Sequence, residues 1–242
     1  MKRLSDFKVL TFDCYGTLID WESGMIDALS GLTSRLKPEL TRDQILQDHA
    51  WHESHQQKVT PSMPYRQLLA VVYKRLAEQW GLKVSWQDCE TYGQSVYETW
   101  PAFEDSTRAL AYLKDHFQLV ILSNVDNQSF SGSNRRLEVT FDAIYTAEDV
   151  GSYKPNDANF QYMIDHLARR GIDKSDILHT AESMFHDHQP ATRFGLARCW
   201  IYRRHDQSGY GATMDPGTQP SVDFQFNSMA AMVEAHQAEQ NG

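Results

Sequence analysis

Cysteine is scarce in this chain, and so is positive charge. The 242 residues include three cysteines, Cys14, Cys89 and Cys199, an odd number at wide spacing. This pattern predicts neither a disulfide framework nor a zinc cluster, and a reducing cytoplasm is the simplest location for it. Lysine and arginine total 23 against 32 aspartates and glutamates, which gives a formal net charge of −9. We therefore expect neither nucleic acid nor an anionic membrane among the partners.

Long hydrophobic runs are also missing. No stretch reaches the ~18 apolar residues that a membrane helix needs, and residues 1–8 contain no apolar signal core. There is no internal repeat and no low-complexity segment. Hydrophobic residues make up 41% of the chain and charged residues 23%, which is ordinary globular composition. These absences together predict a soluble, cytoplasmic globular protein.

The most informative feature that is present is an apolar run that ends in an aspartate. The run from Val9 to Phe12 favours a β-strand, Asp13 follows it, and Gly16 marks a turn. In an open α/β sheet, ligands bind at the carboxyl ends of the strands. A carboxylate held there with free oxygens can act as a nucleophile. Taken alone, the segment also fits an aspartate that only caps a turn.

Two kinds of periodicity divide the chain. Between residues 21 and 100 the apolar positions have helical spacing, which predicts a block of helices. After Pro101, strands and helices alternate, and this alternation predicts a parallel sheet covered by helices. The strands are expected at residues 8–13, 118–122, 143–146, 177–180 and 199–202. We expect a core made of residues 1–18 and 101–242, with a helical insertion of residues 19–100.

Further motifs accompany Asp13 along the chain. Ser123 ends a second apolar strand, Lys154 precedes a proline, and Glu182 and Asp187 follow a third strand. In this order and spacing the chain resembles the haloacid dehalogenase superfamily. Its segment Asp-Cys-Tyr-Gly-Thr is most similar to that of the L-2-haloacid dehalogenases. The resemblance implies an α/β fold with a Rossmann-like parallel-sheet core and an inserted helical cap, and it makes a homodimer a family expectation.

The resemblance also implies a set of catalytic residues. Asp13 would attack the carbon that bears the halide and form an ester, which water then hydrolyses. Lys154 would keep this carboxylate ionised. Thr17 and Ser123 would steady the nucleophile, and Asp187 would orient the water. The expected activity is removal of halide from a small 2-haloalkanoic acid, an anionic substrate, without metal or other cofactor.

Tyr15 separates this expectation from a phosphatase activity. Phosphatases of the superfamily carry a second aspartate at this position, which protonates the leaving group. A tyrosine titrates near pH 10 and is a poor acid at neutral pH, whereas a halide leaves without a proton. A Mg²⁺-dependent phosphatase, with Asp13, Glu182 and Asp187 as oxygen ligands, is the alternative. A non-catalytic binding protein on the same scaffold is a third.

The substrate-facing residues depart from the dehalogenase pattern. The family places a halide-binding arginine after a tryptophan of the cap, and here Trp51 is followed by His52. Arg66, on the next expected helix, is another source of positive charge. Where the family has a serine, this chain has Glu182. The substrate-binding candidates are therefore Tyr15, Asn124, His52, Arg66 and Glu182.

The triplet His186-Asp187-His188 invites a metal interpretation. Adjacent side chains point apart, however, and rarely share one ion. We therefore expect both histidines at the surface or behind the site, and no metal ligands among them.

Overall fold

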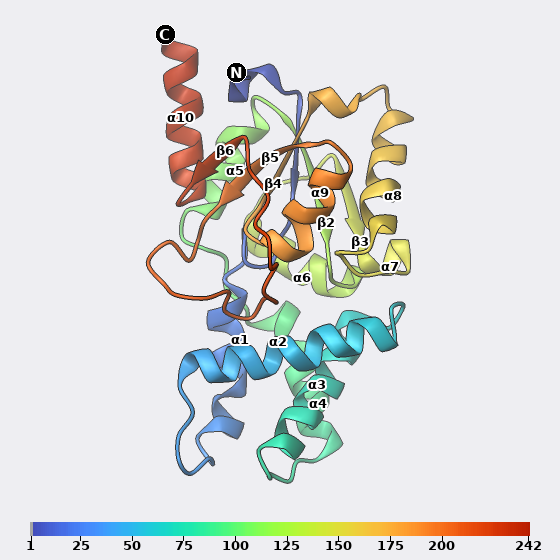
Figure 1. Cartoon of the computed structure of the whole chain (residues 1–242), viewed down its shortest axis with the longest axis vertical. Coiled ribbons are helices and arrows are strands. Elements are labelled where there is room, and N and C mark those ends of the chain that lie inside the picture. Colours follow the sequence, from blue (N-terminus) through green and yellow to red (C-terminus); the bar gives the residue numbers. More distant parts are fainter. Residues whose placement is uncertain (1) are drawn as a thin grey trace.

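The computed structural model describes residues 2–242 and shows a parallel sheet covered by helices, with a further layer of helices beyond one end of the sheet (Figure 1). The sheet has six strands in the order β3-β2-β1-β4-β5-β6, and every neighbouring pair is parallel. The strands are β1 (Val9–Phe12), β2 (Gln118–Ser123), β3 (Ala143–Thr146), β4 (Ile177–Ala181), β5 (Ala197–Ile201) and β6 (Phe224–Phe226). This is the α/β class with a Rossmann-like core that the sequence predicts.

Helices cover both faces of the sheet because both faces are apolar. The helices of the core are α5 (Ser106–Lys114), α6 (Asn127–Leu137), α7 (Ala147–Val150), α8 (Asp157–Ala168), α9 (Gln189–Arg193) and α10 (Met229–Asn241). Leu10 and Phe12 belong to a buried cluster that includes residues of α5 and α10. Val9 belongs to a second cluster, which includes residues of α8. Successive side chains of a strand point to opposite faces, so one short strand supports both helical layers.

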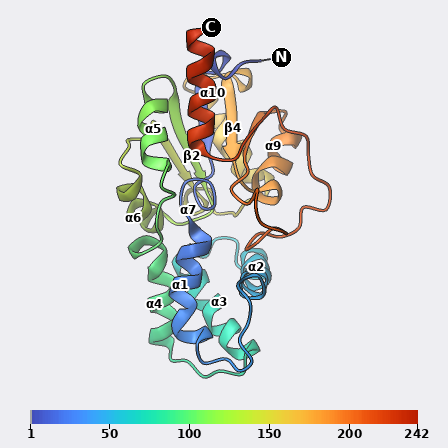
Figure 2. The same cartoon turned by 90° about the vertical axis from the view of Figure 1, so that its left-hand side faces the viewer.

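Four helices form a separate layer at the foot of the molecule (Figures 1 and 2), which we call the helical unit. They are α1 (Trp21–Thr33), α2 (Arg42–Val59), α3 (Tyr65–Gln79) and α4 (Trp86–Glu98). The side chain of Thr41 accepts the N–H of Gln44, and that of Gln44 accepts the N–H of Thr41, so α2 begins with a capping box.

The chain enters and leaves the helical unit at adjacent points. Ile19 forms an antiparallel bridge with Ala102, and the N–H of Asp20 donates to the carbonyl oxygen of Pro101 at 2.8 Å. This arrangement is what an insertion into a continuous core requires, because the core chain resumes where it was interrupted.

The C-terminal region holds structure that the sequence patterns did not predict. Strand β6 and helix α10 follow the long loop after β5. Helix α10 continues to Asn241, close to the end of the sequence. Glu239 of this helix accepts the N–H groups of Leu4 and Ser5, each at 2.9 Å, and so ties the two ends of the described chain together. Within residues 2–242 no helix is long and apolar enough to cross a membrane.

The carboxyl ends of the strands point toward the helical unit (Figure 1). Asp13 directly follows β1, Ser123 is the last residue of β2, and Asp187 lies shortly after β4. The candidate residues of the core therefore gather at one edge of the sheet, with the helical unit facing them.

Candidate active site

The ammonium group of Lys154 lies between the carboxyl groups that follow β1 and β4. Its Nζ donates to Asp13 Oδ1 at 3.0 Å, to Asp187 Oδ1 at 2.7 Å and to the carbonyl oxygen of Leu122 at 2.8 Å. The three charged residues are buried, and the most exposed of them, Asp13, is only 6% accessible. Buried charges persist when they are paired and hydrogen-bonded. The structure therefore brings together three residues that lie far apart in the sequence, as expected.

Thr17 holds the second oxygen of Asp13. Its Oγ1 donates to Asp13 Oδ2 at 2.8 Å and accepts the N–H of Glu182 at 2.9 Å. The turn between Asp13 and Thr17 requires Gly16, whose φ is +95°, and a Cβ there would meet the Trp21 ring nitrogen at 3.0 Å. Both oxygens of Asp13 thus have donors, and the turn fixes their direction.

Charge and burial act in opposite directions on the two carboxyl groups. Burial raises the pKa of Asp13 above its ordinary value, and Lys154 opposes this rise. Burial would also raise the pKa of Asp187, but Lys154 and a hydrogen bond from His179 outweigh it and hold that pKa well below its ordinary value. Burial alone would lower the pKa of Lys154, whereas the two carboxylates raise it. Lys154 therefore stays charged, and Asp187 is the more firmly ionised carboxylate.

A buried chain of hydrogen bonds positions Asp187 from within the sheet. His179 Nε2 lies 3.0 Å from Asp187 Oδ1, and its Nδ1 lies 2.9 Å from Thr11 Oγ1. Asp187 belongs to a short π-helix, η3 (Met184–His188), a conformation that is frequent at functional sites. Its Oδ2 is buried and has no hydrogen-bond partner within residues 2–242. That oxygen can accept a hydrogen bond from a ligand or a water.

Asn124, directly after β2, supports the site, whereas Ser123 forms no hydrogen bond to Asp13 and does not line the cavity. Asn124 Nδ2 donates to the carbonyl oxygen of Lys154 at 3.0 Å, and Asn124 Oδ1 accepts the N–H of Lys154 at 2.6 Å. Asn124 lines the cavity, but its amide is engaged in fixing the Lys154 backbone. The hydroxyl group of Ser123 is buried and has no partner in the described chain.

A small cavity lies beside Asp13, between the sheet edge and the helical unit. Its volume of about 30 Å³ suits a ligand of a few heavy atoms. The helical unit contributes Trp21, Glu53 and Tyr65 to its wall. The core contributes Asp13, Tyr15, Asn124, Val125, Lys154, Ser183, His186, Asp187 and Thr213.

Tyr15 lines this cavity, but its hydroxyl group is bound elsewhere. The hydroxyl lies 2.7 Å from Ser133 Oγ and donates to the carbonyl oxygen of Ser129 at 3.3 Å, both on α6. Burial raises the pKa of Tyr15 well above its ordinary value. The phenol is therefore a poor proton donor at neutral pH, as expected, and the ring forms part of the cavity wall.

The two cations expected from the helical unit do not line the cavity. His52 Nε2 lies 2.6 Å from Gln79 Oε1, and burial lowers the pKa of His52. Arg66 donates to Asp126 Oδ1 at 2.8 Å and forms an ion pair with that buried carboxylate. Neither residue belongs to the cavity wall. The proposed replacement of the halide-binding arginine by His52 or Arg66 therefore has no support in the geometry.

Glu182 does not join the cavity either. Its side chain lines neighbouring pockets with Arg204. Burial, followed by the charge of Glu22, raises its pKa to about 8. Within residues 2–242 no group of three or more histidine, cysteine, aspartate or glutamate side chains has the arrangement of a metal site. The donor set expected for Mg²⁺ is thus split, and Lys154 already bridges its other two members, so these residues do not fit the ion.

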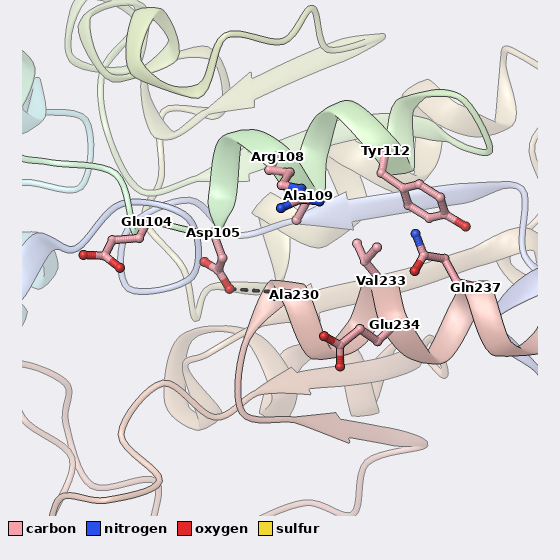
Figure 3. A pocket seen from close by; sticks show the side chains of 9 residues that line it. All are labelled: Glu104, Asp105, Arg108, Ala109, Tyr112, Ala230, Val233, Glu234 and Gln237. Carbon is pink, nitrogen blue, oxygen red and sulfur yellow. Dashed lines mark hydrogen bonds between the residues drawn. The ribbon is translucent and has the colours of Figure 1, made fainter.

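A larger cavity, of about 540 Å³, lies between α5 and α10 (Figure 3). It contains none of the candidate residues. Asp105 on its wall is already bound by Arg203 at 2.8 Å and by the N–H of Ala230 at 3.0 Å. Because the motif residues gather elsewhere, the smaller cavity beside Asp13 is the candidate active site.

Comparison with protein families gives one match that covers most of the chain. The model of the haloacid dehalogenase-like hydrolases matches residues 7–180, which include Asp13, Ser123 and Lys154. The chain belongs to this family. It is therefore a hydrolase of the haloacid dehalogenase-like family, as the motifs predict. No curated protein matches the chain.

Solved structures of the family share the fold along nearly the whole chain. One L-2-haloacid dehalogenase has a TM-score of 0.77 at 18% identity, with 96% of this chain and 99% of the other covered. The L-2-haloacid dehalogenase of Xanthobacter autotrophicus has a TM-score of 0.76 at 16% identity, with 96% and 98% covered. A putative hydrolase of the family from Bacillus subtilis, solved with magnesium, has a TM-score of 0.72 at 17% identity, with 96% and 98% covered. These likenesses show the fold alone.

Several cavity residues of this hydrolase had no signal in its sequence. His186 was expected at the surface or behind the site, yet it lines the cavity, and burial lowers its pKa to about 4. His188 is fully buried, and its Nε2 lies 2.9 Å from the carbonyl oxygen of Ala181, so it lies behind the site, one of the two expected positions. Glu53 lies one residue after His52, and only the orientation of α2 shows which of the two faces the core.

The arrangement can support attack by a carboxylate. Asp13 is held at both oxygens, has a cation beside it and faces a small cavity. Fixing the nucleophile in place removes part of the entropic barrier. Asp187, with one oxygen unpaired within residues 2–242, lies on the other side of Lys154 and faces the same cavity. A nucleophile and a second, ionised carboxylate are the two groups that an ester-forming hydrolase needs.

Proposed function

We propose that this hydrolase removes halide from a small 2-halo-substituted substrate through an ester on Asp13, without a metal ion. The observation that carries the proposal is the Lys154 bridge between Asp13 and Asp187, combined with a Tyr15 hydroxyl that is bound to α6. The bridge holds a nucleophile and a water-orienting carboxylate together. The bound phenol leaves no proton donor at the position where a phosphatase needs one.

The proposed reaction has two steps. An oxygen of Asp13 forms a bond to the carbon that bears the halogen, and the halide leaves with the electron pair of the broken bond. Water, oriented by Asp187 Oδ2, then attacks the carbonyl carbon of the ester. The product leaves as an alcohol with one original oxygen of Asp13 and one proton of the water. Asp13 retains the oxygen of the water and returns to a carboxylate when the second proton leaves to solvent. Dividing one difficult displacement into two steps in this way lowers the barrier.

The names of the structural neighbours support the same class, since they include L-2-haloacid dehalogenases. 2-Haloalkanoic acids are therefore the first substrates to test. The structure gives less support to the expectation of an anionic substrate. A 2-haloacid brings its own carboxylate, and the cations expected to receive the substrate, His52 and Arg66, are not in the cavity wall.

The test is halide release with EDTA present, combined with turnover in ¹⁸O-water. The substrates are both enantiomers of 2-chloropropionate, bromoacetate and fluoroacetate. The expected result is halide release together with ¹⁸O in the peptide that contains Asp13. Release without label in Asp13 would contradict the ester, because water would then have attacked the substrate directly. Absence of release from every halogenated compound would contradict the proposed function.

A further inference from the structure

A carboxyl group faces the cavity from the helical unit. Glu53 lies on α2, which runs across the helical unit close to the core (Figure 1). It is 7% exposed and shares the cavity wall with Asp13 and Lys154. Charged side chains are almost never fully buried unless they are paired. A buried glutamate in the cavity wall is therefore expected to have a cation or a hydrogen-bond donor as its partner.

The protein neighbours of Glu53 compensate its charge only in part. Gln57 Nε2 donates to Glu53 Oε1 at 2.9 Å, and His49 Nδ1 lies 3.4 Å from Glu53 Oε2. Burial, followed by the charge of Glu53, raises the pKa of the Tyr65 hydroxyl well above its ordinary value. Within residues 2–242, no lysine or arginine forms an ion pair with this carboxyl group.

The charges of the cavity wall are unbalanced. Three of its residues carry carboxyl groups, Asp13, Glu53 and Asp187, and one, Lys154, carries an ammonium group. That ammonium is taken up by Asp13 and Asp187. Burial lowers the pKa of His186 to about 4, so this ring is neutral at neutral pH. An incoming anion would meet Glu53 as a like charge, which disfavours binding.

We infer that Glu53 makes this cavity select substrates that present a hydrogen-bond donor or a positive charge, such as an amide or amidinium group, beside the reacting carbon. The reacting carbon is the one named in the proposed function, so this substrate class rests on that proposal. A 2-haloamide carries a halogen on the reacting carbon and presents a hydrogen-bond donor beside it. It has nearly the shape of a 2-haloacid. Its amide N–H groups can donate to Glu53 where a carboxylate cannot.

The test compares three small ligands of nearly the same shape and different charge. Acetate is an anion, acetamide is neutral, and acetamidinium is a cation. Their binding to the wild type is followed by NMR titration through the ring signals of Trp21 and His186, which line the cavity. We expect acetamidinium to bind at least about tenfold more tightly than acetate, with acetamide between them. Equal or tighter binding of acetate, or no detectable binding of acetamidinium, would overturn the inference.

Two variants assign the preference to the residue. Glu53→Gln should reduce the ratio between acetamidinium and acetate to about threefold or less, because it removes the charge and keeps the shape. Glu78→Gln, at an exposed glutamate of the same unit that pairs with Lys74, should leave the ratio unchanged. If the ratio survives in Glu53→Gln, the preference comes from elsewhere and the assignment fails.

Halide release separates this inference from the proposed function. Chloroacetamide should be a better substrate than chloroacetate for the wild type, and Glu53→Gln should narrow the difference. If acetamidinium binds more tightly than acetate but neither chloroacetamide nor chloroacetate releases halide, the selectivity by Glu53 is supported and the proposed dehalogenation is rejected. If acetate binds more tightly and chloroacetate releases halide, the proposed dehalogenation is supported and the selectivity by Glu53 is rejected.

Discussion

The two walls of the cavity differ in whether a cation compensates their carboxyl groups. On the sheet side, Asp13 accepts from Thr17 and Lys154, and Lys154 has three acceptors of its own. On the side of the helical unit, Glu53 has a glutamine and a histidine beside it and no lysine or arginine partner within residues 2–242. A nucleophile that is held at both oxygens suits a reaction that needs fixed geometry. A carboxyl group without a cationic partner leaves hydrogen-bonding capacity for a ligand.

The origin of the two walls matches this division. The sheet-side residues follow strands at the carboxyl edge, where the register of a parallel sheet sets their spacing. The residues of the helical unit come from two helix starts, Trp21 of α1 and Tyr65 of α3, and from one helix face, which carries Glu53. We infer that the core sets the chemistry and the helical unit sets the selectivity, and the following changes test this contrast.

Asp13→Asn should have the largest effect. An amide is a far weaker nucleophile than a carboxylate, and loss of such a group lowers kcat by roughly 10⁴-fold. Halide release by the purified variant measures this loss. The fold should be retained, because the amide oxygen of the substituted side chain can still accept from Thr17. Asp20→Asn, at the N-cap of α1, is the matched control and should retain activity. If Asp13→Asn releases halide as fast as the wild type, Asp13 is not the nucleophile.

Lys154→Met should impair both catalysis and stability. Two buried carboxylates would lose their shared cation, which costs about 3–5 kcal/mol of unfolding free energy. Urea denaturation measures this cost, with Lys174→Met, at an exposed lysine, as the control. Loss of the ammonium group also removes its opposition to the raised pKa of Asp13.

The same variant should shift the pH dependence of any remaining activity. Attack requires ionised Asp13, so activity falls as the pH is lowered through its pKa. Because Lys154 lowers that pKa, the acid limb of the kcat/KM profile should lie at higher pH in Lys154→Met than in the wild type. An unchanged limb would mean that another group controls ionisation of the nucleophile.

The difference between the walls also explains what the sequence could predict. The edge residues Asp13, Ser123 and Asp187 follow runs of apolar residues, and parallel pairing brings the ends of such runs together. Lys154 lies in the loop that follows β3 and the short helix α7, and its Lys-Pro pair and its place in the motif order identified it. The fold class and this half of the cavity could therefore be predicted from local patterns and motif order.

The other half depends on helix rotation, which local patterns do not determine. His52 and Glu53 are adjacent on α2, and a rotation by about 100° exchanges which one faces the core. His52 faces Gln79 instead, and Glu53 takes the cavity position. His179 gave no signal either, because a histidine within an apolar strand resembles any other core residue. Strand β6 is short and follows a long polar loop, so its three residues had no detectable period.

Glu182→Gln should raise stability at alkaline pH. The folded-state pKa of about 8 lies above the ordinary value of 4.5, so the folded protein favours the protonated form. Stability contributed by that form is complete below about pH 4.5 and is lost as the pH rises toward 8. Glutamine cannot ionise and should gain on the order of 2 kcal/mol at pH 8.5 relative to wild type. Urea denaturation at pH 5 and pH 8.5 measures the gain, which should be near zero at the lower pH.

Arg66→Ala should have the smallest effect on ligand binding, and this sharpens the contrast. Arg66 pairs with Asp126, which also caps α6 by accepting the N–H of Ser129 at 3.0 Å. Its loss should cost about 1.5–3 kcal/mol of stability, the range of one hydrogen bond to a charged group. The dissociation constant of acetate should change less than about twofold, because the pair lies outside the cavity wall. A tenfold weakening of acetate binding would instead identify Arg66 as the residue that binds an anionic substrate. The helical unit would then supply the cation that the sequence analysis expected.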